Sequence, residues 1–169
     1  MMLFNEPHYP GVLKVISGGQ TGADRGGLEA ARTIGLATGG TAPRNFMTAN
    51  GSDYTLQSFG LVALGDYRTR TIKNIKDSDG TVIFAHDVKS PGTVLTVNQA
   101  RANKKPVLIL EFAKDCSTSD IQVMAERLTD FVKANRIVSL NVAGNREIKG
   151  SSLVQCITMA VLVIALSPE

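Results

Sequence analysis

The residues with the clearest chemical potential form a glycine-rich stretch at residues 17–27, which reads Ser-Gly-Gly-Gln-Thr-Gly-Ala-Asp-Arg-Gly-Gly. It follows a β-branched run at residues 12–16 and precedes a segment that suits a helix, so its glycines occupy a strand-to-helix turn. Backbone N–H groups at a helix start lack partners within the helix, and glycine lets a phosphate approach them closely. The stretch therefore predicts an anion site. Its candidate contacts are Gly18, Gly19, Gln20, Thr21, Gly22, Asp24 and Arg25.

Several of these residues have a structural alternative. The glycine spacing matches neither the dinucleotide fingerprint nor the P-loop, and glycine at a tight turn can be purely steric. Thr21 and Asp24 also have the spacing of a helix cap. A carboxylate repels phosphate, so at a ligand we expect Asp24 to meet a ribose hydroxyl, a base edge or a bridging Mg²⁺. Asp24 is the one candidate for a catalytic residue, and no catalytic role is assigned.

Short apolar runs alternate with helical patterns along the rest of the chain. Such alternation predicts an α/β fold of three layers, with a mostly parallel sheet covered by helices on both faces. We expect one domain at residues 12–169, preceded by an N-terminal arm at residues 1–11. The expected strands are 12–16, 36–41, 81–85, 106–110 and 137–142, the expected helices are 24–34, 69–76, 93–102, 118–135 and 153–166, residues 46–60 form a long loop, and residues 61–64 fit either a strand or a helix.

Ligands of such sheets bind beyond the carboxyl ends of the strands, which directs attention to the residues after each strand. Guanidinium groups at Arg44 and Arg146 suit bidentate phosphate contacts and, with two glycine turns, predict a pocket for a phosphorylated small molecule. The alternatives are solvent-exposed arginines and a structural histidine at position 86. The candidates at these strand ends are Arg44, His86, Gly92, Thr93, Gly144, Asn145 and Arg146.

Composition excludes several classes of partner. The net charge of the 169-residue chain is +3, its basic residues are scattered, and aromatic residues make up 5% with no Trp, so we expect no nucleic acid polymer as partner. The apolar run at residues 153–166 is too short to cross a membrane, which predicts a helix hidden on nearly all sides, in the core or partly in a homo-oligomer interface.

Cysteine usage and the N-terminus favour a cytoplasmic protein. Cys116 and Cys156 are far apart and form no Cys-x-x-Cys pair, so we expect reduced thiols. Residues 1–11 lack the pattern of a signal peptide. No metal-binding motif and no Ser-His-Asp pattern is evident, so no metal ligated by the protein is expected.

Several motifs together resemble the molybdenum cofactor carrier family, in the circularly permuted YpsA-like branch of the SLOG superfamily. The motifs are residues 17–26, Ala-Pro-Arg at 42–44, Arg-Thr at 70–71 with Asn74, residues 78–81, and Asn-Val-Ala-Gly at 141–144 with Arg-Glu at 146–147. The resemblance implies a Rossmann-like fold, a homo-dimer or homo-tetramer, and a pocket for a pterin or nucleotide phosphate. It also implies that residues 18–21 cradle phosphate, that Arg44 and Arg146 hold anionic groups, and that Arg70 is a further ligand contact.

The same superfamily contains cytokinin-activating phosphoribohydrolases, which cleave the base from a nucleoside monophosphate. Their signature P-G-G-x-G-T-x-x-E is reduced here to residues 91–96, and Thr96 stands where the glutamate would be. A hydroxyl cannot replace that carboxylate as a base or as a stabiliser of positive charge. We therefore expect a carrier or sensor for a phosphorylated ligand, with any molybdenum inside its cofactor. Nucleoside-phosphate hydrolysis is the alternative, and Arg70 keeps it open.

Overall fold

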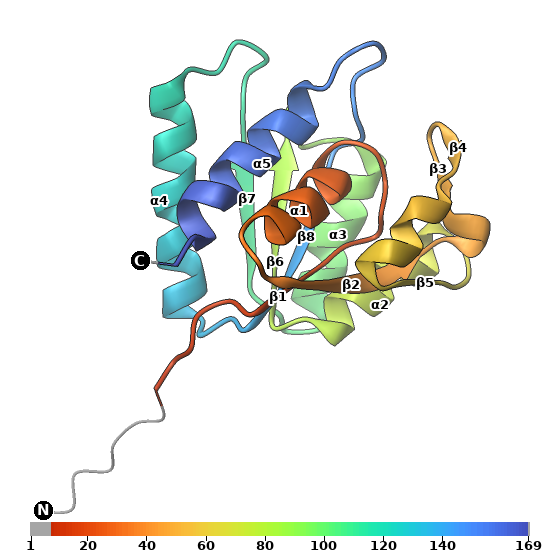
Figure 1. Cartoon of the computed structure of the whole chain (residues 1–169), viewed down its shortest axis with the longest axis horizontal. Coiled ribbons are helices and arrows are strands. Elements are labelled where there is room, and N and C mark those ends of the chain that lie inside the picture. Colours follow the sequence, from red (N-terminus) through yellow and green to blue (C-terminus); the bar gives the residue numbers. More distant parts are fainter. Residues whose placement is uncertain (1–7, 169) are drawn as a thin grey trace, which may run out of the picture.

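Six parallel strands form the central sheet of this computed structural model, which describes residues 8–168. The strand order is β5-β2-β1-β8-β6-β7, and each neighbouring pair is parallel. All carboxyl ends therefore lie at one edge of the sheet (Figure 1). The strands are β1 (Lys14–Ile16), β2 (Ala37–Ala42), β5 (Leu61–Ala63), β6 (Gly80–Ala85), β7 (Val107–Glu111) and β8 (Ser139–Gly144).

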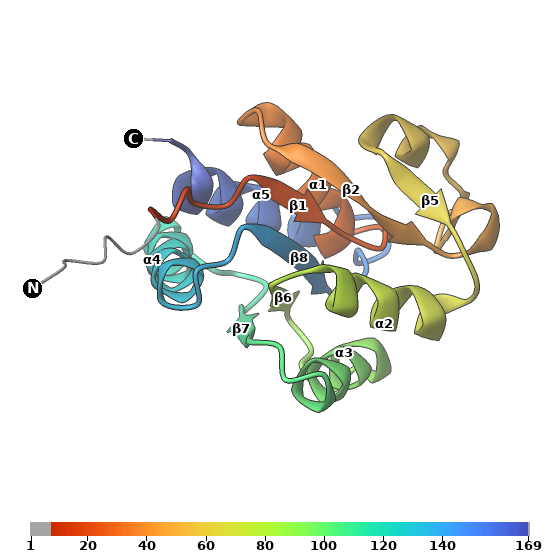
Figure 2. The same cartoon turned by 90° about the horizontal axis from the view of Figure 1, so that it is seen from below.

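Helices cover both faces of this sheet (Figure 2). On one face α1 (Ala23–Thr33), α4 (Thr118–Ala134) and α5 (Leu153–Leu166) enclose the main apolar core. On the other face lie α2 (Tyr67–Asp77) and α3 (Pro91–Ala102). The expected α/β, Rossmann-like fold is confirmed, because each short apolar strand is followed by a segment that folds back over the sheet.

Residues 43–60, of which 46–60 were expected as a long loop, form a compact insert between β2 and β5. The insert contains a 3-10 turn (Arg44–Phe46), the hairpin β3–β4 (Met47–Thr48 and Gly51–Ser52) and a second 3-10 helix (Tyr54–Phe59). Arg32 of α1 places its guanidinium carbon 3.4 Å from the centre of the Phe59 ring, and Arg25 lies 4.8 Å from it. The insert has a small apolar core of its own: Leu28, Ala42, Phe46, Leu56, Phe59 and Leu61.

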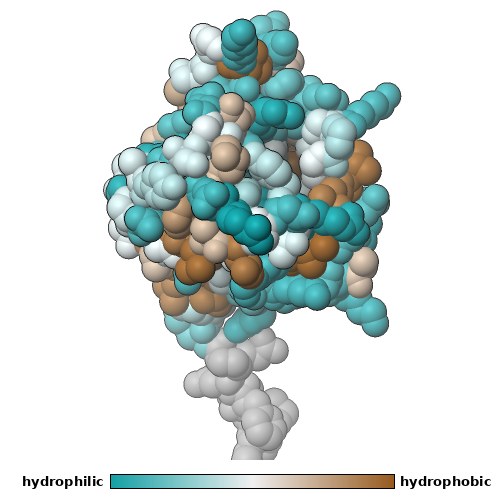
Figure 3. Space-filling view, turned by 90° about the vertical axis from the view of Figure 1, so that its right-hand side faces the viewer, coloured by the Kyte–Doolittle hydropathy of each residue, from teal (hydrophilic) through white to brown (hydrophobic). Residues whose placement is uncertain are grey.

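The segment that the sequence left undecided, residues 61–64, begins with the edge strand β5. Val62 is 65% exposed and Leu64 is 49% exposed, so the strand lacks the continuous burial that marks the central strands. Figure 3 shows this side of the molecule, where apolar patches lie among hydrophilic side chains. An edge strand packed on one face has a weak apolar pattern, which explains the ambiguity.

Helix α5 is less hidden than expected. It packs closely on α1, since a Cβ at Gly26 would lie 2.8 Å from the Gln155 carbonyl oxygen, and it also packs on α4. Cys156 and Ile164 are nevertheless exposed, the latter by 49%, so the helix is not hidden on nearly all sides within one chain, and its expected part in a homo-oligomer interface stays a prediction. Two helical neighbours and one sheet face do not surround a helix completely. No helix within residues 8–168 is both long enough and apolar enough to cross a bilayer.

Most of the expected N-terminal arm, residues 1–7, lies outside the described residues. Of the remainder, Tyr9 donates a hydrogen bond from its hydroxyl to the Ile137 carbonyl at 2.6 Å. Residue 9 is thus attached to the segment that leads into β8.

Candidate functional site

The glycine loop, residues 17–22, turns sharply between β1 and α1. Gly19 and Gly22 have left-handed backbone angles, with φ of +76° and +85°. A Cβ at Gly22 would lie 2.5 Å from the Asn145 carbonyl oxygen, so glycine is required where this loop passes the residues after β8. The Ala23 N–H donates to that same carbonyl at 3.1 Å. The loops that follow β1 and β8 therefore contact each other directly.

Backbone N–H groups of the glycine loop are occupied by side chains of the same region. The N–H of Gly19 donates to Ser17 Oγ at 3.2 Å, that of Thr21 to Gln20 Oε1 at 2.9 Å, and that of Gln20 to Asp24 Oδ2 at 3.1 Å. Helix α1 has no side-chain cap at Gly22, and Thr21 does not supply one. Both residues of the predicted cap pattern instead bond to backbone elsewhere: the Asp24 carboxylate accepts from the Gln20 N–H at 3.1 Å, and the Thr21 hydroxyl accepts from the Glu147 N–H at 3.3 Å.

Asp24 forms a buried ion pair with Arg70 of α2, with Oδ2 3.0 Å from Nη1. The Asp24 side chain is 3% exposed and that of Arg70 14%. Burial raises the pKa of the Asp24 carboxyl above its usual value, and the opposing attraction of Arg70 does not cancel this effect. Position 18 has no room for a side chain, because a Cβ there would overlap the Arg70 guanidinium. Gly18 therefore makes space for Arg70.

Asp24 and Arg70 line a small crevice of about 50 Å³ at the edge of the sheet where the strands end. Its walls come from α1, α2, the start of α3 and the end of β8. Among the described residues that line it, Asp24 is the sole carboxylate and Arg70 the sole cation. Thr96 donates from its hydroxyl to the Gly92 carbonyl at 2.8 Å. The full lining is Asp24, Arg70, Thr71, Asn74, Gly92, Thr96, Asn141, Ala143 and Gly144.

A larger groove of about 260 Å³, the outer groove, lies against other residues of the glycine loop. Arg25 forms ion pairs there with Glu29 at 2.9 Å and Asp53 at 3.0 Å. The Glu147 carboxylate accepts from the N–H groups of Val154 and Gln155 at the start of α5, at 3.0 and 2.9 Å. The charged side chains Arg25, Asp53 and Glu147 that line the outer groove therefore have bonding partners within the protein. The lining is Gly19, Thr21, Gly22, Arg25, Thr48, Asn50, Asp53, Glu147, Ser151, Ser152 and Gln155.

Asn145 connects the loops that follow β8 and β6. Its Oδ1 accepts from the His86 and Asp87 N–H groups, each at 2.9 Å, and its Nδ2 donates to Thr93 Oγ1 at 3.2 Å. The His86 ring packs edge-on against Phe112, with centroids 6.1 Å apart. Asn145, His86 and Thr93 are therefore engaged in holding the strand-end loops, and none of them lines the crevice or the outer groove.

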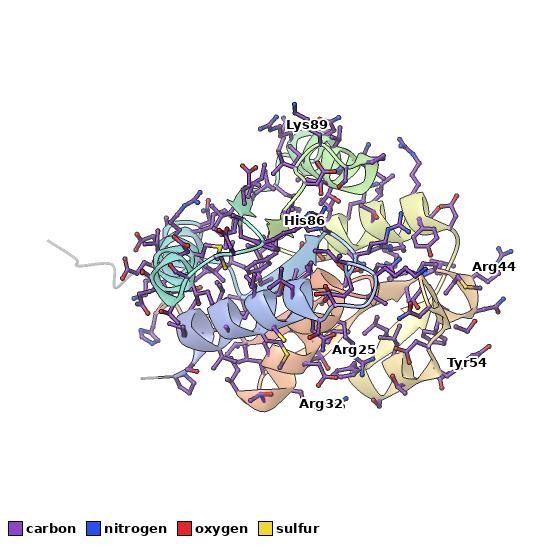
Figure 4. The ribbon with its side chains drawn as sticks, turned by 90° about the horizontal axis from the view of Figure 1, so that it is seen from above. Arg25, Arg32, Arg44, Tyr54, His86 and Lys89 are labelled. Carbon is purple, nitrogen blue, oxygen red and sulfur yellow. The ribbon has the colours of Figure 1, made fainter. Side chains whose placement is uncertain are left out.

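The two arginines expected to hold anionic groups lie apart from these cavities. Arg44 and Arg146 are both exposed, and neither lines the crevice or the outer groove. Figure 4 shows Arg44 on the insert, pointing away from the body of the molecule. Of the predicted contacts, the crevice brings together Asp24, Arg70, Gly92 and Gly144, and the outer groove brings together Gly19, Thr21, Gly22 and Arg25.

Sequence reasoning did not place Thr71, Asn74 or Asn141 among the site residues. Asn74 of α2 bridges to the backbone of β2, since its Oδ1 accepts from the Thr41 N–H at 2.8 Å and its Nδ2 donates to the Thr41 carbonyl at 2.9 Å. These side chains come from a helix face and a strand interior, where no local spacing announces a site. The family motifs alone included these positions, as they included Arg70.

Comparison with known proteins agrees with the observed fold. A model of the circularly permuted YpsA SLOG family matches residues 15–164. The chain belongs to this family. It also resembles the crystal structure of a protein from Syntrophus aciditrophicus SB that bears the provisional name molybdenum carrier protein, with a TM-score of 0.81 and 34% identity over 93% of this chain and 96% of the other. No curated protein matches the chain.

The described part of this family member holds no group of three or more His, Cys, Asp or Glu side chains arranged to bind a metal ion. The charged side chains that line the strand-end crevice are Asp24 and Arg70. Of these, Arg70 is the cationic group that the fold brings to the strand-end crevice.

Proposed function

We propose that this protein binds a phosphorylated small molecule at the strand-end crevice and acts as a carrier of the molybdenum cofactor, whose pterin bears a phosphate. The observation that carries the proposal is the buried Arg70 guanidinium, which lines the crevice while its Nε has no hydrogen-bond partner among residues 8–168. A buried donor of this kind gains from an anionic acceptor. Family membership and the name of the similar protein support the choice of ligand.

The size of the crevice limits what enters it. A pocket that encloses a nucleotide-sized ligand has at least about 300 Å³. The crevice has about 50 Å³, so only an anionic group fits inside, and the rest of the ligand lies outside. We propose Arg44 and Arg146, which are exposed, as contacts for further anionic groups, and the glycine loop as a second phosphate contact. A bound Mg²⁺ could bridge ligand oxygens to this region.

Binding without turnover is favoured over hydrolysis of a nucleoside phosphate. A glycosidase mechanism requires carboxylates flanking the scissile bond. The one carboxylate that lines the crevice is Asp24, which already bonds Arg70 and the Gln20 N–H, and Thr96 directs its hydroxyl to a backbone carbonyl. Incubation with AMP, followed by separation of products, should leave AMP intact. Release of adenine that disappears in Asp24→Asn would establish hydrolysis instead.

Native mass spectrometry of protein purified without denaturation tests the carrier proposal directly. We expect a retained pterin phosphate with bound molybdenum, its loss in Arg70→Gln, and its retention in Arg68→Gln, a control on the exposed side of the same helix. If no phosphate-bearing compound is retained and none raises the melting temperature, the proposal fails, because a ligand that prefers the native state must raise it. The same spectrum tests our proposal that the protein is a homo-dimer or homo-tetramer. A cytoplasmic location is part of the proposal.

A further inference from the structure

The Asp24 carboxylate already occupies donors that an incoming anion would use. Its Oδ2 lies 3.0 Å from Arg70 Nη1 and 3.1 Å from the Gln20 nitrogen, and the side chain is 3% exposed. Guanidinium groups and backbone N–H groups at a helix start are also the donors that phosphate prefers. Asp24 therefore competes with any anionic ligand for the same side of the crevice.

Arg70 retains donors for a second anion. A guanidinium has five N–H donors, and within residues 8–168 the side chain makes a single hydrogen bond, to Asp24. Its Nε is buried and has no partner there. Arg70 can therefore bind an anionic group of the ligand while it still faces Asp24.

The small volume of the crevice brings the two anions together. An anion inside about 50 Å³ lies next to both Asp24 and Arg70, because both line the same space. Two negative charges in contact in a buried site cannot both persist beside one cation. The carboxyl is the group that can respond by taking up a proton, and burial already raises its pKa.

We propose that an anionic group entering the crevice binds Arg70, while the Asp24 carboxylate takes up one proton from solvent and remains in place as a neutral acid. This proposal rests on the proposed function, since it takes Arg70 as the receiving group. Before binding, Asp24 balances the charge of Arg70; afterwards the ligand does. Affinity for the anion then increases about tenfold for each unit by which the pH falls, over the range in which one proton is taken up.

Other charged groups do not face Asp24 from the elements packed around it. The sequences of α5, β2, β6 and β8 contain no charged residue, and Lys14 lies at the start of β1, at the opposite edge of the sheet. The charged residues of α2 other than Arg70, and Arg101 of α3, are exposed. Arg25, Asp53 and Glu147 line the outer groove and are held by partners of their own. The proton balance of the crevice therefore depends on the pair alone.

Calorimetry with sulfate tests the exchange on the unmodified protein, because sulfate does not itself take up protons near neutral pH. We expect uptake of about one proton per bound sulfate, measured from the dependence of the binding heat on the ionisation heat of the buffer. Affinity should be about tenfold higher at pH 6 than at pH 7. Binding of sulfate without proton uptake would overturn the exchange. AMP serves as a second probe of binding alone, because its own phosphate takes up a proton at about pH 6.

Two variants sharpen this test. Asp24→Asn has a neutral side chain of the same shape, so it should bind sulfate as tightly at pH 7 as the unmodified protein does at acid pH, without proton uptake. Asp130→Asn, on the exposed face of α4, should keep the unmodified behaviour. If sulfate and AMP bind at no pH, both the exchange and the proposed function fail. If they bind but Asp24→Asn keeps the original pH dependence, only the exchange fails.

Discussion

The two cavities lined by the glycine loop and its neighbours differ in size and in how their charges are used. The crevice holds about 50 Å³ and contains one buried ion pair whose arginine has an unpaired Nε. The outer groove holds about 260 Å³, and its charged side chains bond to the insert and to the start of α5. The larger cavity is therefore a structural junction, and the smaller one is where an anion would find an unsatisfied donor.

Replacement of Arg70 should give the largest effect on the crevice. Arg70→Met leaves the Asp24 carboxylate buried and unpaired, which we expect to lower the free energy of unfolding by about 3–5 kcal/mol at neutral pH. The double variant Asp24→Asn with Arg70→Met should recover much of this loss. Denaturant unfolding of the single and double variants measures it. Equal stability of both would mean that the pair is not desolvated.

A methyl group at position 18 should disrupt the crevice by displacing Arg70. Gly18→Ala is expected to cost about 1–3 kcal/mol of stability and to abolish sulfate binding, because the new Cβ overlaps the guanidinium. Gly92→Ala is the matched control for stability, since a Cβ there would meet nothing within 4 Å. Thermal unfolding and sulfate titration give both readouts. If Gly18→Ala still binds sulfate, Arg70 is not part of the sulfate-binding site.

Loss of a charge from the outer groove should affect the insert and leave the crevice intact. Arg25→Ala removes half-exposed ion pairs and a contact with the Phe59 ring, for which we expect about 1 kcal/mol of lost stability. Limited proteolysis should then cut residues 43–60 faster. Sulfate affinity should be unchanged, and Arg44→Ala should alter neither property. A fall in sulfate affinity in Arg25→Ala would mean that the crevice and the outer groove contribute to one binding site.

The smallest expected effect is a change in the pH dependence of stability when Asp24 is replaced. Because the pKa of Asp24 is raised in the folded state, its contribution to stability is complete below about pH 4 and is lost as the pH rises through the folded-state pKa. Asp24→Asn lacks this loss, so its melting temperature relative to the unmodified protein should rise between about pH 4 and pH 7. A constant difference would show that Arg70 fully compensates for burial.

Local patterns predicted most of the fold. The central strands β6, β7 and β8 are apolar runs, and α1 and α5 begin and end near the predicted positions, because periodicity and glycine placement act over short range. The insert and β5 were less clear. The core of the insert depends on Leu28 of α1 and Phe59 meeting in space, and no spacing within residues 43–60 reveals that contact.

The sequence by itself determined that a glycine turn follows the first strand of a parallel sheet, and the resemblance to the superfamily placed Thr96 where the hydrolase signature has a glutamate. Only the tertiary structure decided what the glycines do. Gly18 leaves room for the guanidinium of Arg70, and this arginine pairs with Asp24, which lies 46 residues earlier in the chain. The N–H groups of the loop bond to neighbouring side chains. The reason is physical: turn chemistry is local, whereas desolvation and pairing of a buried charge depend on which distant element covers it.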